Sequence, residues 1–190
     1  MIDQFTGLFT AVISPFINNK LDENSFVKLL ATQKNTDGIV IGGTTGESPT
    51  LSDFEKLELF RRAKAFVGSR CKIIAGTGSN DTAHAIHLSK TAQDVGADAL
   101  LVVTPYYNKA TSEGLIAHYS AIAGAVDIPL ILYNVPSRTG VDIPVSVYQA
   151  LSIIPNIVGI KEASADIVKI AKIRAACPDL AIYSGNDDQI

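Results

Sequence analysis

A lysine at the end of an apolar run is the residue of this chain that most needs a chemical explanation. In the stretch NIVGIKEAS, apolar residues and a glycine lead directly into Lys161, which Glu162 follows. Lysine is rarely buried, and apolar surroundings lower the pKa of its amine. A neutral amine at physiological pH can attack a ketone and form a Schiff base. The simpler alternative is a lysine whose charged end reaches solvent or pairs with Glu162.

A tyrosine and an arginine follow another apolar run. In YNVPSRTG, Tyr133 ends the run and Arg138 lies in a loop that closes at Gly140. Tyrosine can relay a proton, which carbinolamine formation and dehydration both require. Arginine can hold a carboxylate through paired hydrogen bonds. Taken singly, a packed tyrosine and a surface arginine explain these residues equally well.

Two further loops contain groups of interest. GGTTGES is not a Walker A loop, because no lysine follows its second glycine. Its glycines let the backbone approach a ligand, and Thr44, Thr45 and exposed N–H groups can bind a carboxylate or an oxyanion. An ordinary strand-to-helix turn is the alternative. In TPYYN, the adjacent aromatic residues Tyr106 and Tyr107 lie at a loop tip and indicate an interface.

Seven apolar or β-branched runs must bring these groups together. Most runs are continuous, which is typical of strands buried on both faces of a parallel sheet. Every run ends in polar residues or glycine, whereas an open doubly wound sheet gathers its ligand groups at one switch point. In a (β/α)8 TIM barrel all strands open onto one face that holds the site, so we predict this α/β fold. The runs are GLFTAVISP, GIVIGGTTGE, KIIAGTG, ALLVVTPYY, IPLILYNVP, NIVGIKEAS and LAIYSGND.

Helical segments separate the runs. In the clearest, LSDFEKLELFRRAKAFV, Ser52 and Glu55 form a capping box. We expect its apolar side to consist of Phe54, Leu57, Phe60 and Phe66. Further crossovers are SNDTAHAIHLSKTAQDVG, TSEGLIAHYSAIAGAV, IPVSVYQALSII and ADIVKIAKIRAAC.

The number of runs is one short of a complete barrel. A TIM barrel has eight strands and typically about 250 residues, whereas this sequence has seven runs in 190 residues. We therefore expect residues 1–190 to form one incomplete (β/α)8 barrel, truncated after the seventh strand. The eighth strand and a C-terminal helical region would then lie outside this chain.

Composition excludes several classes of protein. With 47% hydrophobic and 18% charged residues and a net charge of −3, the chain should fold and has no basic character that would favour nucleic acid or an anionic membrane. Cys71 and Cys177 show no metal or disulfide spacing, and the N-terminus lacks the basic region of a signal peptide. We predict a cytoplasmic protein. We expect no metal site, because the histidines have no evident set of partner ligands: His84, His87 and His118.

In this order and at these spacings, GTTGES, TPYYN, YNVPSRTG and GIKEAS resemble the dihydrodipicolinate synthases of the N-acetylneuraminate lyase superfamily of class I aldolases. The resemblance covers essentially the whole chain. It implies a lyase that condenses pyruvate with L-aspartate-4-semialdehyde to 4-hydroxy-tetrahydrodipicolinate in lysine and diaminopimelate synthesis. It also implies a homo-oligomer, either a dimer or a tetramer. No cofactor is implied, because the covalent imine between Lys161 and pyruvate is itself the electron sink.

The resemblance further implies a role for each site residue. Lys161 matches the lysine that forms the Schiff base. Tyr133 matches the tyrosine of a proton relay completed by Thr44 and by Tyr107, the latter from a neighbouring subunit. The substrate-binding positions are Thr45 for the pyruvate carboxylate, Arg138 for the carboxylate of the semialdehyde, and Gly185 near the position whose backbone carbonyl approaches the site.

Two positions depart from the pattern of lysine-inhibited family members. Their allosteric pocket uses a histidine and a glutamate, and the matching residues here are Lys56 and His84. Lys56 would repel the ammonium groups of a lysine ligand, and His84 removes a carboxylate that would bind one of them. We expect weak or absent feedback inhibition.

Two other functions remain open. One is an N-acetylneuraminate lyase or a 2-keto-3-deoxy sugar-acid aldolase that uses the same imine on Lys161. The other is a catalytically silent binding or regulatory protein on the same scaffold. Arg138 favours the synthase over a sugar-acid aldolase, and the joint presence of Lys161, Tyr133, Thr44 and Tyr107 argues against a silent protein.

Overall fold

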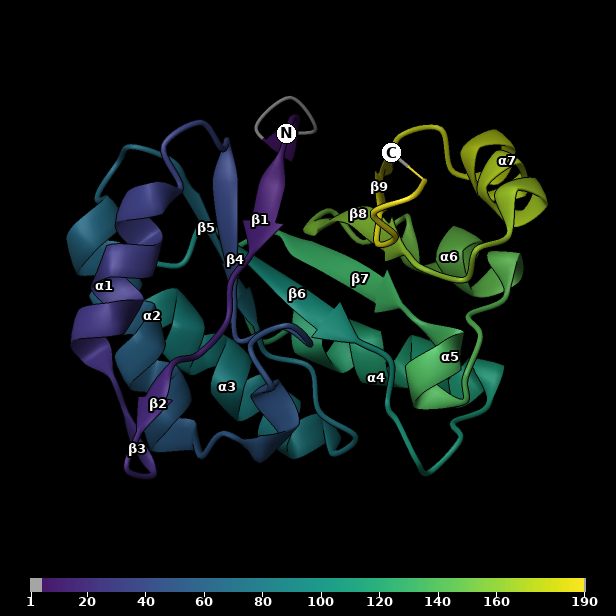
Figure 1. Cartoon of the computed structure of the whole chain (residues 1–190). Helices are drawn as coiled ribbons and strands as arrows, with labels where there is room; N and C mark the ends of the chain where they lie inside the picture. Colours follow the sequence, from purple (N-terminus) through teal and green to yellow (C-terminus); the bar gives the residue numbers. More distant parts are fainter. Residues whose placement is uncertain (1–4, 190) are drawn as a thin grey trace.

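A seven-stranded parallel sheet organises the molecule in the computed structural model, which describes residues 5–189. The strand order follows the chain order without reversal, so the sheet curls in one direction, as Figure 1 shows. A doubly wound sheet would reverse at a switch point. The predicted TIM-barrel fold is confirmed, and all seven apolar runs form strands. They are β1 (Phe9–Ala11), β4 (Gly38–Ile41), β5 (Lys72–Gly76), β6 (Ala99–Val103), β7 (Leu130–Asn134), β8 (Ile157–Glu162) and β9 (Ala181–Ser184).

Helices cover the outer side of the sheet (Figure 1). All the predicted helices form, whereas the sequence analysis does not predict α1, the short α5, the single turn η2 (Ser48–Thr50) or the hairpin of β2 (Phe16–Ile17) and β3 (Lys20–Leu21). The helices are α1 (Glu23–Thr32), α2 (Asp53–Val67), α3 (Thr82–Asp94), α4 (Ser112–Ala123), α5 (Pro136–Thr139), α6 (Val145–Leu151) and α7 (Ile167–Ala176). Within residues 5–189, none of them combines the length and the apolar composition that crossing a membrane requires.

Helix α2 has the predicted capping box but buries a different face. Ser52 accepts a hydrogen bond from the backbone N–H of Glu55, whose side chain accepts one from the backbone N–H of Ser52. The expected apolar side is correct only in part: Phe60 is buried, but Phe54 is 72% exposed and Phe66 is also exposed. The buried stripe begins with a lysine in place of an apolar residue, so the pattern of apolar residues alone does not reveal which face is buried. The stripe consists of Lys56, Leu59, Phe60, Ala63 and Val67.

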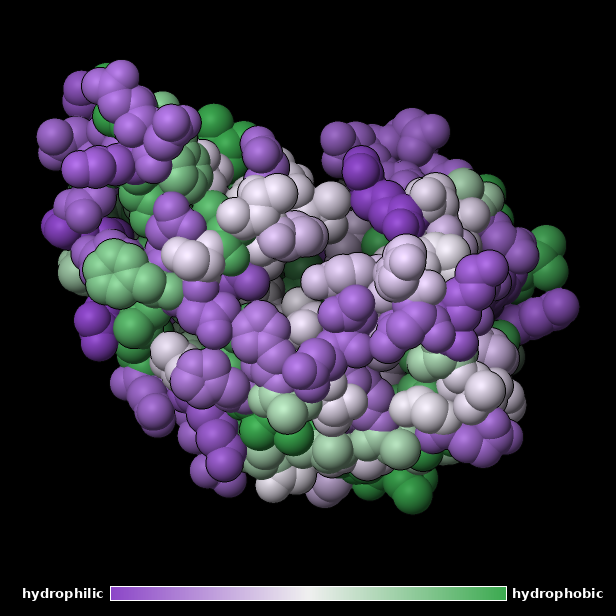
Figure 2. All heavy atoms as spheres, turned by 90° about the horizontal axis from the view of Figure 1, so that it is seen from below, coloured by the Kyte–Doolittle hydropathy of each residue, from purple (hydrophilic) through white to green (hydrophobic). Residues whose placement is uncertain are grey.

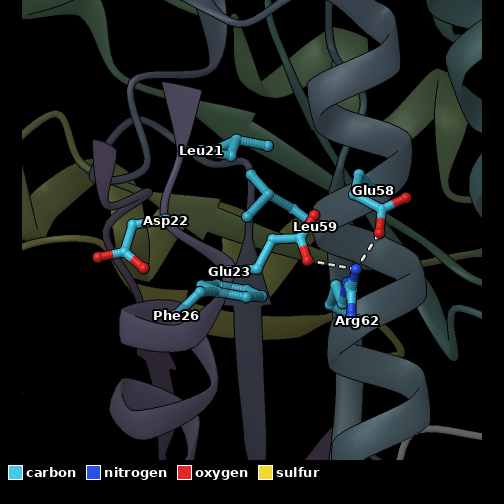
Figure 3. A pocket seen from close by; sticks show the side chains of 7 residues that line it. All are labelled: Leu21, Asp22, Glu23, Phe26, Glu58, Leu59 and Arg62. Atoms are coloured by element: carbon cyan, nitrogen blue, oxygen red, sulfur yellow. Dashed lines mark hydrogen bonds and ion pairs between the residues drawn. The ribbon is translucent and has the colours of Figure 1, made fainter. Parts of the chain in front are cut away.

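The contact between α1 and α2 leaves a small hollow (Figure 3). Phe26 and Leu59 lie along it, and Arg62 closes it by pairing with Glu23 and, at 2.8 Å, with Glu58. The hollow has no room for a water molecule. It is therefore a packing contact between two helices and not a ligand site.

The curled sheet separates two apolar cores. The outer core lies between the sheet and the helices, and the inner core lies on the concave side. Side chains of the outermost strands meet beside the inner core, where the Tyr183 ring contacts the Phe9 ring edge-on with centroids 5.9 Å apart. The Tyr183 hydroxyl also donates to the backbone carbonyl oxygen of Phe5, which precedes β1, at 2.6 Å. The eighth strand outside this chain stays a prediction.

Candidate active site

A bulge in β8 turns Lys161 towards the inner core. The pairing of β7 with β8 shifts by one residue at Val158, which faces the inner core. Ile157 and Ile160 both pack in the outer core although they are three positions apart, an odd spacing that a regular strand would put on opposite faces. The extra residue reverses the alternation, and Lys161 faces inward opposite Tyr133.

Glycine is required next to this bulge. A Cβ atom at Gly159 would lie 2.9 Å from the ring of Tyr183 and 3.1 Å from the carbonyl oxygen of Ala181. Either contact would push β9 away from β8. The glycine of GIKEAS therefore lets the last strand pack closely beside Lys161.

The amine of Lys161 lies in a half-buried position against an aromatic ring. Its Nζ is 4.7 Å from the ring centroid of Tyr133. Burial lowers the pKa of Lys161, and the charge of Asp187 opposes this shift only in part. The lowered pKa is predicted from the sequence. The role of Asp187 is not, because a loop residue after β9 gives no local signal of its distance from β8.

Gly185 lies beside the lysine side chain. A Cβ atom there would be 3.2 Å from Cε of Lys161 and 2.7 Å from Cβ of Ala163. The Gly185 N–H donates to the carbonyl oxygen of Glu162 at 2.8 Å, which fixes the loop against β8. Any larger residue at position 185 would displace the loop or the amine.

A cavity of about 310 Å³ opens where the strands end. Figure 2 looks from below onto this end of the sheet and shows a hollow ringed mostly by hydrophilic residues. Thr44, Tyr133 and Arg138 line the cavity, as predicted from the sequence. Lys161 is not part of the lining, but its Nζ is 4.7 Å from the ring centroid of Tyr133, which is. The remaining lining residues are Gly42, Gly43, Ser48, Pro49, Gly76, Gly78, Leu101, Val103, Tyr106, Val135 and Thr139.

Four of the predicted residues are not part of the cavity lining: Lys161 and Gly185, described above, and Thr45 and Tyr107. Thr45 is exposed and is not part of the lining. Tyr107 is 91% exposed and has a φ of +75°, an unusual conformation for a bulky residue. Its neighbour Tyr106 lines the cavity instead, so the two adjacent tyrosines have different environments.

Glu162 lies on the other face of β8, away from Lys161. It is 2% exposed, and its carboxylate accepts hydrogen bonds from Asn134 Nδ2 at 2.8 Å and from the Tyr148 hydroxyl at 3.2 Å. Alternation along the strand predicts this direction. The partners are not evident from the sequence, because they come from β7 and α6 and share no local pattern.

The two positions that match the allosteric pocket lie near the start of α2. Lys56 is 5% exposed, and its burial lowers its pKa while the charge of Asp53 opposes the shift. His84 Nε2 lies 2.8 Å from Asp53 Oδ1, and His84 Nδ1 lies 3.2 Å from Ser79 Oγ. The histidine therefore links the beginnings of α2 and α3.

The part of the chain that the structure describes contains no cluster of three or more His, Cys, Asp or Glu side chains arranged to hold a metal ion. The groups that face or adjoin the cavity are an amine, a phenol, a guanidinium and a hydroxyl. These groups can bind carboxylates and move protons. That the reaction needs no metal stays a prediction.

The fold is a TIM barrel, and its site holds an inward-facing lysine of lowered pKa at the end of β8, beside a tyrosine. The model of the dihydrodipicolinate synthetase family matches residues 4–190, and the chain belongs to this family. The predicted family is confirmed.

Known relatives agree with this assignment. The chain is 50% identical over 189 residues to the 4-hydroxy-tetrahydrodipicolinate synthase of Caldicellulosiruptor saccharolyticus, covering 98% of this chain and 64% of that protein. The synthase structure from Methylacidiphilum fumariolicum SolV is 48% identical with a TM-score of 0.94, and 96% of this chain covers 62% of it. The chloride-inhibited dihydrodipicolinate synthase of Acinetobacter baumannii, solved in complex with pyruvate, is 48% identical with a TM-score of 0.92, at coverages of 96% and 64%. The chain thus spans slightly less than two thirds of the length of these relatives.

Proposed function

We propose that this chain carries the imine-forming site of a 4-hydroxy-tetrahydrodipicolinate synthase, which condenses pyruvate with L-aspartate-4-semialdehyde. The observation that carries the proposal is the half-buried amine of Lys161, 4.7 Å from the ring of Tyr133 and next to a cavity that Arg138 lines. Burial lowers the pKa of Lys161 and so increases the fraction of neutral, nucleophilic amine. The relative solved in complex with pyruvate supports this choice of substrate.

The first half of the reaction forms the imine. The amine of Lys161 attacks the keto carbon of pyruvate, and the carbonyl oxygen takes up a proton. Loss of water from the carbinolamine leaves an iminium between Lys161 and pyruvate. Tyr133 is next to this amine and is the group that would carry the protons, together with Thr44.

The second half forms the carbon–carbon bond. The iminium draws electrons from the pyruvate methyl group, which loses a proton and becomes an enamine. The enamine carbon attacks the aldehyde carbon of the semialdehyde, and the aldehyde oxygen takes up a proton. The amino group of the semialdehyde then displaces Lys161 from the imine carbon and closes the ring. Arg138 would hold the semialdehyde carboxylate, and Thr45 and the loop at Gly185 would complete the pyruvate site.

We also propose that Tyr107 acts on a neighbouring copy of this chain in a cytoplasmic homo-oligomer. Its exposed side chain and left-handed backbone support a contact outside its own barrel. Mixing Tyr107→Phe and Lys161→Ala subunits tests the relay. An active site that takes an intact Lys161 from one variant and an intact Tyr107 from the other should recover activity that neither variant has alone. If the mixture recovers no activity, the site is not shared between subunits.

Borohydride trapping in the full-length protein tests the proposed function. Incubation with pyruvate and borohydride should add the reduced pyruvate unit to the peptide that contains Lys161, as read by mass spectrometry. Lys172, exposed on α7, is the internal control and should remain unmodified. No adduct would refute every aldolase function of this site. An adduct combined with cleavage of a sugar acid, and no turnover of the semialdehyde, would favour the sugar-acid aldolase.

We propose weak inhibition by lysine. The two matching positions hold the buried amine of Lys56 and the His84 side chain, which pairs with Asp53, and neither supplies a carboxylate for a lysine ligand. Turnover of the full-length enzyme should therefore change little at millimolar lysine. Strong inhibition would contradict the proposal, and the double variant Lys56→His with His84→Glu should increase the response.

A further inference from the structure

Two pairs of residues connect β7 and β8 at the end of these strands. Tyr133 is in register with Lys161, and Asn134 is in register with Glu162. The first pair faces the inner core, and the second pair faces the helices. Because each pair is one residue from the other, any shift that separates Asn134 from Glu162 also separates Tyr133 from Lys161.

The amide of Asn134 uses both its N–H donors and its oxygen. Its Nδ2 donates to Glu162 Oε1 and to Asp142 Oδ1, both at 2.8 Å, and its Oδ1 accepts from the Ile143 N–H at 3.1 Å. Asp142 and Ile143 directly follow the Arg138 loop, the segment 135–141 that includes the short helix α5. One buried side chain therefore holds both the β7–β8 pairing and the base of this loop.

Glu162 and its other partners extend this support to α6 and α7. The carboxylate accepts hydrogen bonds from Asn134, from the Ser164 N–H at 2.9 Å and from the Tyr148 hydroxyl at 3.2 Å. Lys169 Nζ lies 3.7 Å from Glu162 Oε2 and also pairs with Asp142. Tyr148 is fully buried, and burial followed by the charge of Glu162 raises its pKa, so it stays a hydrogen-bond donor.

We propose that Asn134, Glu162 and Tyr148 are positioning residues of the active site. The network on the outer face fixes the register of β7 and β8 and the base of the Arg138 loop, and thereby the spacing between the amine of Lys161 and the ring of Tyr133. This inference rests on the proposed function, in which Lys161 attacks pyruvate. Misplacing a reacting group by about 1 Å can slow a reaction about a hundredfold, so a loosened network would slow imine formation.

A matched pair of variants separates positioning from stability. Tyr148→Phe removes the hydroxyl that bonds Glu162. Tyr119→Phe removes a hydroxyl that bonds the Val102 carbonyl oxygen at 3.4 Å, on the outer face of β6. Both tyrosines are 0% exposed, so the same atom is lost from the same kind of environment.

The measurement is the rate constant of pyruvate trapping by borohydride as a function of pH, in the full-length protein. It is made at 25 °C, with circular dichroism confirming that each variant is folded. We expect Tyr148→Phe to lower the plateau of the rate about tenfold without moving the pH midpoint, and Tyr119→Phe to leave the rate unchanged. Asn134→Asp, which faces Asp142 and Glu162 with a third carboxylate, should lower the rate further; if it unfolds, Tyr148→Phe still decides.

The possible results separate this inference from the proposed function. Equal rates in wild type and Tyr148→Phe, or equal losses in Tyr148→Phe and Tyr119→Phe, overturn the positioning role and leave the proposed function intact. A shifted pH midpoint with an unchanged plateau also overturns it, because the network would then act on the charge of the amine. Absence of any adduct in the wild type overturns the proposed function itself, and the positioning role with it.

Discussion

Two lysines near the end of β8 have opposite surroundings. Lys169, on α7, is 7% exposed and lies against the carboxylates of Asp142 and Glu162. Lys161, on the other side of the strand, lies against the ring of Tyr133, and none of the ion pairs within residues 5–189 includes it. Burial without a paired carboxylate favours the neutral amine of Lys161, whereas Lys169 is held in place by two carboxylates. The comparison separates a lysine suited to chemistry from a lysine suited to structure.

Removing Lys161 should affect activity and leave stability intact. We expect Lys161→Met to lower turnover about ten-thousandfold or more, because no other amine is available to form the imine. The melting temperature should stay the same or rise, since a half-buried amine is replaced by an apolar side chain of similar length. Steady-state assays and calorimetry test this prediction. Lys172→Met on exposed α7 is the control, and a fall in melting temperature confined to Lys161→Met would contradict the comparison.

Removing Lys169 should mainly lower the stability of the fold. Lys169→Met leaves Glu162 buried without its cation, and we expect a loss of about 3–5 kcal/mol in the free energy of unfolding. Urea unfolding of the full-length protein gives this quantity. If Lys169→Met were as stable as Lys172→Met, the cluster on the outer face would not be a stabilising ion pair.

A residue next to Lys161 should affect both properties moderately. Gly185→Ala places a Cβ atom 2.7 Å from Ala163 Cβ and 3.2 Å from Lys161 Cε. We expect about a tenfold slower pyruvate trapping, and about 1–3 kcal/mol of lost stability from the overpacking. Gly114→Ala, which would meet only ordinary contacts on α4, serves as the control. Normal trapping in Gly185→Ala would mean that the amine tolerates displacement.

Histidine 118 gives the smallest predicted effect and extends the comparison to a buried base without a carboxylate partner. Burial lowers the pKa of His118 to about 4 in the folded protein, below its ordinary 6.5, and the charge of Asp81 opposes this shift. Between these pH values the unfolded chain binds more protons than the folded one. The contribution of His118 to stability is therefore complete above pH 6.5 and is lost as the pH falls towards 4.

We expect the loss to be about 1 kcal/mol between pH 6.5 and pH 5.5. Urea unfolding at both pH values, compared with His118→Gln, isolates this contribution from those of the carboxylates. The same pH dependence in wild type and variant would show that protonation of His118 is not linked to folding.

Sequence alone predicts the inner face of the sheet well and the outer face poorly. Lys161 and Tyr133 end continuous apolar runs, so their place at the carboxyl edge of a parallel sheet follows from the local sequence. The partners of Glu162 are different: Tyr148 and Lys169 lie on separate helices, and only packing brings them together. As residue types on a helix, a tyrosine and a lysine give no sign of this role.

The helix α2 illustrates the same limit. Its buried stripe begins with Lys56, while the exposed Phe54 imitates a core residue. The tyrosine pair of TPYYN is a further case, because two identical residues have different environments: Tyr106 lines the cavity and Tyr107 is exposed to solvent. Residue type predicts burial only where the direction of the side chain is already fixed by a regular element.

The extra residue at Val158 makes the chemistry of this strand depend on its length. Deleting one residue at the bulge would move Glu162 into the inward-facing place of Lys161, and Lys161 into the outward-facing place of Ile160. Every motif of the sequence would survive such a deletion, but the nucleophile would be gone. An insertion or deletion there should therefore be more damaging than most substitutions, and motif matches alone would not reveal it.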